Sequence, residues 1–335
     1  MQRRPFGETT AGEPVDVFTL TSATGIEVSI ITYGAAVQQL WVPDRKGRRA
    51  NVVLGFATLD GYLAHDGHYF GAIVGRYANR IAGGRFTLDG VVHELVQNDH
   101  GNSLHGGSRG FDKHVWQVLA ADEASLALRY TSADGEMGYP GTLVADVVYT
   151  LARRALRIDY GASTDAPTIV NLTNHTCWNL AGEGVGPVDE HLLTLNAATY
   201  TPVGAGLVPT GEIASVDGTP LDFQTAAAIG SRGYDQNFVL DQPDPGSLAL
   251  AARVEEPRSG RALEVHTTEP GLQLYTGTFL DGTMIGTGGH AYRRGGCVAL
   301  ETQRFPDSPN RPAFPSTVLR PGAPFTSTTV FRLQP

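Results

Sequence analysis

The sequence predicts an all-β protein, a large antiparallel β-sandwich, and three observations lead to this prediction. Short runs alternate apolar and polar residues, as in "LALRYTS" (126–132), "LRIDY" (156–160) and "LEVHTT" (263–268), and this period of two is typical of strands buried on one face. Turn residues separate the runs, for example in "TLDG", "SADGE" and "VDGTP". The 41 glycines and 20 prolines interrupt any long helical pattern, so strands are expected to supply most of the core.

Helix is expected to be minor. The best helical candidate is "DFQTAAAIGS" (222–231), where Asp222 could cap the first turn. No low-complexity linker, composition shift or fixed-period repeat divides the chain. Residues 1–335 are therefore expected to form one continuous β domain, which is long enough to bury a full hydrophobic core.

Composition excludes several classes of partner. The net charge of -9, with no clustered lysines and arginines, argues against a nucleic-acid partner. No stretch approaches the roughly 18 apolar residues of a membrane span, and the opening "MQRRPFGETTAGEP" has no apolar stretch behind its arginines. We therefore expect no membrane partner, a cytoplasmic location, and a monomer or weak homodimer.

The two cysteines, Cys177 and Cys297, are too few for a disulfide scaffold and lack the spacing of a metal site. Two free thiols are expected, and a single bridge between them is the open alternative.

The densest polar cluster is "NLTNHTCWNL" (171–180), which surrounds His175 with asparagines and threonines. In an otherwise apolar strand pattern such a run would leave unsatisfied groups unless it lined a wet cavity or a polar ligand. His175 is therefore a candidate acid, base or ligand.

Two further clusters precede it. In "GRYANRIAGGRFTLDG" (75–90), Asn79 and Arg80 stand between glycines, and the guanidinium of Arg80 offers a fork of donors that suits paired oxygens. In "NDHGNSLHGGSRGFDKHVW" (98–116), two glycines follow His105 and would let the backbone approach a ligand closely. Each cluster alone would more often be a surface turn or loop.

Three segments complete the set. Asp235 precedes an apolar run in "RGYDQNFVL" (232–240), and Gln273 and Tyr275 share one strand face in "PGLQLYTG" (270–277). Glu301 follows an apolar run in "VALETQ" (298–303), where partial desolvation would tune a carboxylate for proton transfer. Glu301 is the candidate general base.

Together, "GRYANRIAGGRFTLDG", "NSLHGG", "NLTNHTCWNL", "YDQNFVL", "PGLQLYTG" and "ETQRFPDSPNRPAFPSTVLRPG" resemble the ordered signatures of the aldose 1-epimerases, also called galactose mutarotases. The resemblance runs from about residue 15 to the last residue. It implies a single β-sandwich domain of the galactose mutarotase type, a concave face that holds a free aldose sugar such as galactose or glucose, and neither a metal nor an organic cofactor.

The resemblance also implies roles for individual residues. Glu301 matches the general base, His175 the general acid, and His105 a histidine that polarises the sugar. The positions that match hydroxyl-binding residues are Asn79, Arg80, Asp235 and Gln273. The sequence departs from the family pattern at Thr176, Cys177 and Trp178, and at Gln236 where histidine is common, which puts pocket shape and sugar preference in question rather than the chemistry.

Several alternatives stay open. A hexose-6-phosphate 1-epimerase would need further cationic residues, for which Arg304 or Arg109 could serve, and a sugar sensor on the same fold would lack the acid or the base. A glycoside hydrolase needs a paired carboxylate acid, which these motifs replace with a histidine. A metal hydrolase built on His65, His68 and His105 lacks a supporting carboxylate motif.

Overall fold

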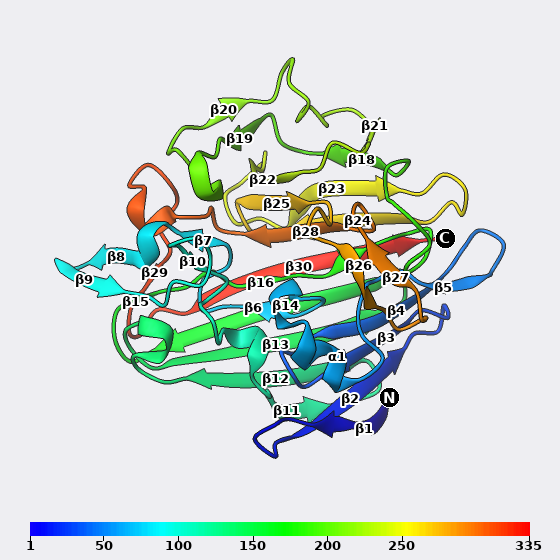
Figure 1. The fold of residues 1–335 in the computed structure, drawn as a ribbon, viewed down its shortest axis with the longest axis horizontal. Coiled ribbons are helices and arrows are strands. Elements are labelled where there is room, and N and C mark those ends of the chain that lie inside the picture. The colour runs from blue at the N-terminus through cyan, green and yellow to red at the C-terminus, as the bar shows by residue number, and fades with distance from the viewer.

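Antiparallel sheets dominate the computed structural model, which describes residues 1–335 (Figure 1). The largest sheet has nine strands, in the order β11 (Gln117–Ala121), β12 (Ser125–Ser132), β13 (Leu143–Ala152), β14 (Ala155–Thr164), β30 (Phe325–Gln334), β24 (Ala262–Thr267), β23 (Ala249–Glu255), β18 (Leu192–Leu195) and β21 (Ala227–Ala228). The three alternating runs of the sequence lie in β12, β14 and β24, so their prediction as strands is confirmed.

A six-stranded sheet faces this one across the core. Its order is β17 (Cys177–Trp178), β28 (Val298–Gln303), β25 (Gly271–Tyr275), β22 (Asp235–Val239), β19 (Thr199–Thr201) and β20 (Ala214–Ser215). Trp178 of this sheet packs on Phe331 of β30, with ring centroids 5.0 Å apart, and Thr302 of β28 hydrogen-bonds Thr329 of β30. These contacts join two antiparallel layers, which confirms the all-β sandwich prediction.

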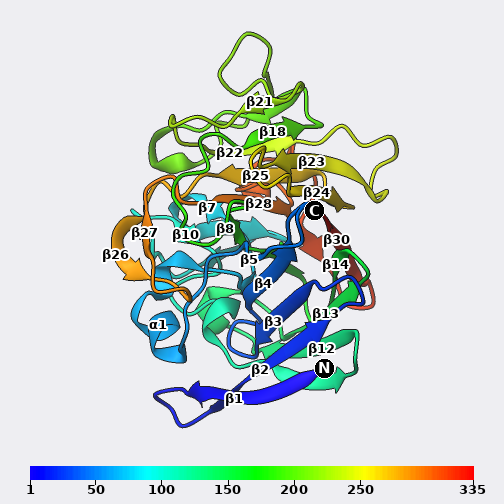
Figure 2. The same cartoon turned by 90° about the vertical axis from the view of Figure 1, so that its right-hand side faces the viewer.

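The remaining elements extend and cover the sandwich. A five-stranded sheet consists of β1 (Gln2–Glu8), β2 (Pro14–Thr21), β3 (Glu27–Ile31), β4 (Val37–Pro43) and β5 (Arg49–Asn51). The two-stranded pairs are β6 (Ile73–Val74) with β16 (Thr173–Asn174), β7 (Arg80–Ile81) with β10 (Ser103–Leu104), β8 (Arg85–Leu88) with β9 (Val91–Glu94), β15 (Thr168–Ile169) with β29 (Val318–Leu319), and β26 (Asp281–Ile285) with β27 (Ala291–Arg293). Figure 2 shows the β26–β27 hairpin and the short α1 on the side of the six-stranded sheet.

Helix is minor, as expected. The helices are α1 (Leu59–Ala64) and six 3-10 turns, η1 (Asp66–His68), η2 (Ala82–Gly84), η3 (Phe111–Lys113), η4 (Glu136–Gly138), η5 (Ala205–Leu207) and η6 (Ser308–Asn310). None of them has the length and apolar content needed to cross a membrane.

The helix predicted at 222–231 is wrong. Residues 227 and 228 form strand β21, which pairs with Leu192 and Leu193 at the edge of the nine-stranded sheet. Asp222 accepts a hydrogen bond from the backbone of Gln224 in a local turn instead of capping a helix. Pairing with a sheet edge and burial of Ile229 outweigh the weak helical preference of three alanines.

The expectation of two free thiols is also wrong. Cys177 and Cys297 form a disulfide, with Cα atoms 5.5 Å apart and 120 residues between them in the sequence. Cys177 lies opposite Ala299 in the pairing of β17 with β28, so strand pairing brings the two sulfur atoms together. A separation of this length carries no signal in the sequence.

Candidate active site

A cavity of about 470 Å³ opens beside the six-stranded sheet. Its lining includes six of the seven residues predicted from sequence, namely Asn79, Arg80, His105, His175, Asp235 and Glu301. A hexose has twelve non-hydrogen atoms, so the cavity has room for a sugar ring.

Glu301 reaches this cavity because β28 is buried on both faces. Val298 and Leu300 point into the core between the sheets, and the alternation of a strand sends Glu301 to the opposite face. Loops cover that face, so Glu301 is only 2% exposed. The carboxylate is thus held on a rigid strand and shielded from bulk water.

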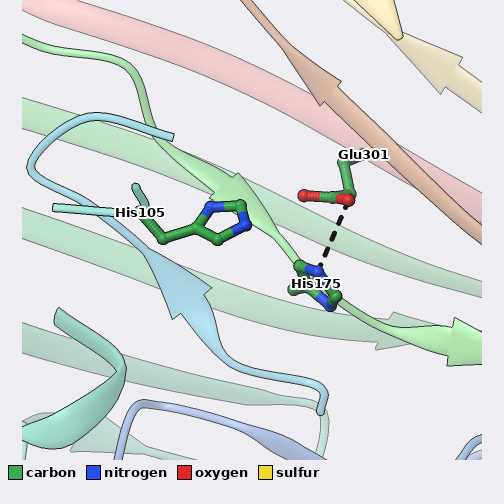
Figure 3. A group of neighbouring side chains, drawn as sticks. All are labelled: His105, His175 and Glu301. Carbon is green, nitrogen blue, oxygen red and sulfur yellow. Dashed lines mark ion pairs between the residues drawn. The ribbon is translucent and has the colours of Figure 1, made fainter. Parts of the chain in front are cut away.

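His175 lies between β16 and β17 and faces Glu301. Its Nε2 atom is 3.6 Å from Oε1 of Glu301, as Figure 3 shows with a dashed line. Its backbone is fixed on both sides, because its N–H donates to the carbonyl of Ala72 and its carbonyl accepts from the N–H of Gly71. The Nδ1 atom is buried and has no protein partner, so the ring keeps a free hydrogen-bonding position.

The polar run around His175 does not line the cavity as the sequence suggested. Asn171 donates to the carbonyls of Ala78 and Arg304, and Asn174 donates to the carbonyl of Gly71. Asn179 donates to the carbonyls of two further glycines. The asparagines therefore hold the surrounding loops, and only His175 of this run reaches the cavity.

His105 is held by a reciprocal pair of hydrogen bonds. Its backbone N–H donates to the carbonyl of Asn79, and the N–H of Asn79 donates to Nδ1 of His105 at 3.1 Å. Both residues have positive φ, 52° and 63°, which lets the two short turns meet. The next residue must be glycine, because a Cβ atom on Gly106 would lie 1.9 Å from the carbonyl oxygen of Gly75.

Arg80 lies among three carboxylates. Its Nε atom donates to Oδ2 of Asp99 at 2.7 Å, and its Nη1 atom is 3.9 Å from Oδ2 of Asp235. Asp99 lines the cavity but was not singled out from sequence, since it stands in a polar loop with no distinguishing neighbour. Arg80 is the only lysine or arginine in the lining, which holds the acids Asp99, Asp235 and Glu301.

Gln273 is the one predicted residue outside the lining. It lies on β25 opposite Glu301, is 4% exposed, and donates from Nε2 to Oδ1 of Asp235 at 2.7 Å. The structure therefore places it behind Asp235, where it orients that carboxylate.

Aromatic side chains form the walls, and sequence reasoning noted Tyr275 among them but missed Tyr69 and Phe279. The ring of Tyr69 lies 4.6 Å from that of His105 and 5.7 Å from that of His175. Tyr275 stacks on Phe279, which is 62% exposed at the rim. Tyr69 has a backbone φ of 54°. No sequence motif identifies it as a residue of the site. Apolar faces of this kind suit the C–H surfaces of a sugar.

Burial controls the protonation of the site. It raises the pKa of the Glu301 carboxyl well above its usual value, with a further rise from the charge of Asp235 and an opposing effect from Arg80. Burial also lowers the pKa of His175. Desolvation is the largest effect on both groups, so both favour their neutral forms.

His105, His175 and Glu301 also have ligand-type atoms within 4.8 Å of one another. The hydrogen bonding of His105 does not fit a metal ligand, however. Because Nδ1 accepts from the N–H of Asn79, the neutral ring carries its hydrogen on Nε2, which makes that nitrogen a donor. The arrangement therefore suits an oxygen ligand such as a sugar hydroxyl. His65 and His68, weighed with His105 for a metal hydrolase, are not part of this cluster.

Comparison with known proteins decides the family. Residues 16–332 match the family model described as aldose 1-epimerase. The chain belongs to the aldose 1-epimerase family. It is 46% identical to the galactose mutarotase of Rattus norvegicus, over 98% of this chain and 97% of the relative. It is 37% identical to the aldose 1-epimerase of Escherichia coli strain K12, over 96% of each chain.

Solved structures of aldose 1-epimerase relatives agree with this fold. The aldose epimerase homologue from C. elegans superposes with a TM-score of 0.89 at 30% identity, over 95% of this chain and 98% of the other. Galactose 1-epimerase from Lactobacillus acidophilus NCFM superposes with a TM-score of 0.85 at 27% identity, over 100% and 99%.

The departures from the family pattern lie away from the cavity. Thr176 hydrogen-bonds Asn174, Cys177 forms the disulfide, and Trp178 packs in the core. Gln236 accepts a hydrogen bond from the backbone of Asp235. None of these residues lines the cavity.

Proposed function

We propose that this member of the aldose 1-epimerase family interconverts the α and β anomers of free hexoses such as galactose and glucose. The observation that carries the proposal is the pairing of Glu301 and His175, 3.6 Å apart, at the wall of a cavity with room for a sugar ring. The C1 hydroxyl and the ring oxygen of an aldose are both bonded to C1. A base and an acid that serve these two oxygens must therefore lie close together.

The proposed reaction begins with proton removal from the C1 hydroxyl by Glu301. His175 delivers a proton to the ring oxygen, the bond between C1 and that oxygen breaks, and the sugar opens to the aldehyde. After rotation about the C1–C2 bond the ring closes on the other face, and each group reverses its role. Proton transfer by one positioned acid or base contributes about 100- to 10,000-fold.

The protonation of the pair suits this reaction. With both groups neutral, Glu301 holds one proton and His175 none. Moving that proton from Glu301 to His175 gives an ionised base and a protonated acid without any change in the total charge of the site. Arg80 favours the ionised form of Glu301, and the hydroxyl groups of a bound sugar would do the same.

The other side chains are proposed to hold the ring while C1 remains free to turn. Arg80, Asp235 and Asn79 supply donors and acceptors for hydroxyl groups, and Nε2–H of His105 polarises the sugar. Gln273 acts on the sugar through Asp235. No organic cofactor or metal has a part in this proposal.

The acidic cavity favours a neutral sugar over a sugar phosphate. Its lining holds three carboxylates and one guanidinium. Arg304 pairs with Glu269 and, like Arg109, is absent from the lining, so neither supplies the cation that a hexose-6-phosphate 1-epimerase would need. The retained Glu301 and His175 likewise favour an enzyme over a sensor.

The test is polarimetry or NMR of freshly dissolved α-D-galactose and α-D-glucose with and without the protein, with glucose 6-phosphate in the same panel. Faster equilibration of the free sugars is expected. An enhancement confined to glucose 6-phosphate would assign the rival substrate, and none for any sugar would overturn the enzymatic proposal.

We also propose that residues 1–335 form one domain, supported by a single 51-residue core cluster that draws on residues from Phe18 to Leu333. A cytoplasmic location and a monomer or weak homodimer remain proposals. Disulfides are rare in cytosolic proteins, so trapping the thiols of Cys177 and Cys297 in freshly lysed cells would test the location.

A further inference from the structure

Gln303 is a buried side chain that the proposed reaction leaves unused. It ends β28, is 0% exposed, and neither its Nε2 nor its Oε1 atom has a hydrogen-bond partner in the protein. A buried polar group without a partner is costly, so a fully buried amide with two free atoms calls for a functional explanation.

The position of Gln303 relates it to the proposed base. Residues two apart on a strand leave the same face, about 6.6 Å from one another, so Gln303 shares a face with Glu301. Oε2 of Glu301, the oxygen not facing His175, is likewise buried without a partner. The spacing of the two side chains therefore suits a single bridging water between the amide and the carboxylate.

The register of the sheet places further polar side chains beside Glu301 and Gln303. Glu301 lies opposite Gln273, Gln273 lies opposite Asn237, and Gln303 lies opposite Gly271. Because position 271 has no side chain, Asn237 occupies that space, and a Cβ atom there would lie 2.8 Å from its Oδ1. The polar side chains of three strands thus converge around Gly271.

Donors and acceptors on this face are unequal. The buried atoms without a partner are Oε2 of Glu301, Oε1 of Gln273, Oδ1 of Asn237, and Oε1 and Nε2 of Gln303. With Glu301 ionised, four are oxygens that accept, and the amide nitrogen of Gln303 is the one donor. The carboxylate is the strongest acceptor of the four when ionised, because hydrogen bonds to charged groups are about twice as strong as neutral ones.

We propose that the amide of Gln303 donates to Oε2 of Glu301 through one bridging water and thereby favours the ionised form of the base. This positioning role rests on the proposed function, in which Glu301 must be ionised to accept the C1 proton. Gln303 touches neither the sugar nor the reacting atoms.

None of the charged and titratable groups around Glu301 donates a hydrogen bond to its Oε2 atom. They are His175, His105, Arg80, Asp235 and Tyr275 in the cavity, and the Arg304–Glu269 pair beyond the end of β28. Asp235 disfavours a charge on Glu301. Arg80 is the one guanidinium that favours it, but its Nε is bonded to Asp99 and its Nη1 lies near Asp235. Arg80 is therefore shared among acids, whereas Gln303 has no competing partner.

The test is the pH profile of kcat/KM for Gln303→Met, which keeps the length of the side chain and removes the donor. A donor to the charged form lowers the pKa of a carboxyl, so its loss should raise the pKa of Glu301. The basic limb, where activity falls as the pair of Glu301 and His175 loses its shared proton, should move to higher pH by about one unit. Activity should fall about tenfold below that limb and less above it.

Gln303→Leu provides a second variant if the methionine variant does not fold. Leucine also lacks a donor and adds no charge near Glu301, so the same upward displacement is expected. Thr302→Val is the matched control, because it removes a buried hydrogen bond on the core face of the same strand. It should lower the melting temperature and leave the basic limb in place.

A basic limb at the wild-type pH in a folded Gln303 variant would overturn the proposal. Equal displacement in Thr302→Val would also overturn it, because the effect would then be one of strand stability. Absence of mutarotation in the wild-type protein would instead overturn the proposed function on which the inference rests, so the two failures are distinguishable.

Discussion

The nine-stranded and six-stranded sheets face one core but use their strands differently. In β14 buried and partly exposed residues alternate along most of its length, whereas all six residues of β28 are buried. The outer face of β14 meets solvent, and the outer face of β28 meets loops and the cavity. The strand with buried polar groups on its outer face, β28, carries the proposed chemistry. The following experiments test whether the six-stranded sheet supplies the chemistry and the nine-stranded sheet the stability.

Glu301→Gln should give the largest effect. The amide keeps the shape of the carboxylate but cannot accept the C1 proton, so the rate should fall by about 100- to 10,000-fold while sugar binding largely survives. Polarimetry measures the rate and calorimetry the binding. Asp146→Asn is the matched control in the nine-stranded sheet, where Asp146 pairs with Arg129 on the outer face, and it should leave the rate unchanged. A near wild-type rate in Glu301→Gln would remove Glu301 as the base.

His175→Asn should lower the rate by a similar factor, because it removes the proposed proton donor to the ring oxygen. His105→Asn should be milder, since His105 is held by Asn79 to position and polarise the sugar. The two rates, measured on the same sugar, decide the assignment. Equal losses would leave no reason to prefer His175 as the acid.

Ile158→Ala tests the opposite half of the comparison. Ile158 is fully buried in β14, so truncation should destabilise the fold by about 2–5 kcal/mol through lost contacts and a cavity. Denaturant unfolding measures this loss, and the rate per folded molecule should stay near that of the wild type. A large change in that rate would mean that the two sheets are coupled in catalysis.

The smallest effects are expected for ring binding. Arg80→Ala or Asp235→Ala should weaken sugar binding by about tenfold or more, because a desolvated sugar hydroxyl loses its partner. The double variant should be non-additive, since the two side chains lie 3.9 Å apart and would grip one ligand. Calorimetry of the four proteins is the measurement. Unchanged affinity in both single variants, with an intact circular dichroism spectrum, would contradict the proposed pocket.

The sequence predicted the fold well because alternation and turn residues are local signals. Strands such as β12 and β24 follow from their own residues, and "TLDG" lies in the hairpin between β8 and β9. The alanine-rich segment at 227–228 was misjudged because pairing with β18, a distant strand, decides its structure. Its local preference and its tertiary environment disagree.

Most of the candidate site was also accessible from sequence, since its motifs carry dense polar clusters. The sequence could not show how far each side chain lies from the cavity. Gln273 and Asp235 look like equal candidates for sugar binding in the sequence, yet the structure places Gln273 behind Asp235. Asp99 and Tyr69 come from loops whose approach to the cavity depends on the path of the backbone. The disulfide likewise depends on the pairing of β17 with β28.

The place of β30 has a consequence for synthesis. This strand follows all others in the chain, yet it lies in the interior of the nine-stranded sheet, hydrogen-bonded to β14 on one side and β24 on the other. On the ribosome, the strands on either side of it emerge first and present two open edges of the kind that pair with other chains. Until β30 emerges and joins the two halves, the nascent chain therefore carries unpaired strand edges that favour aggregation.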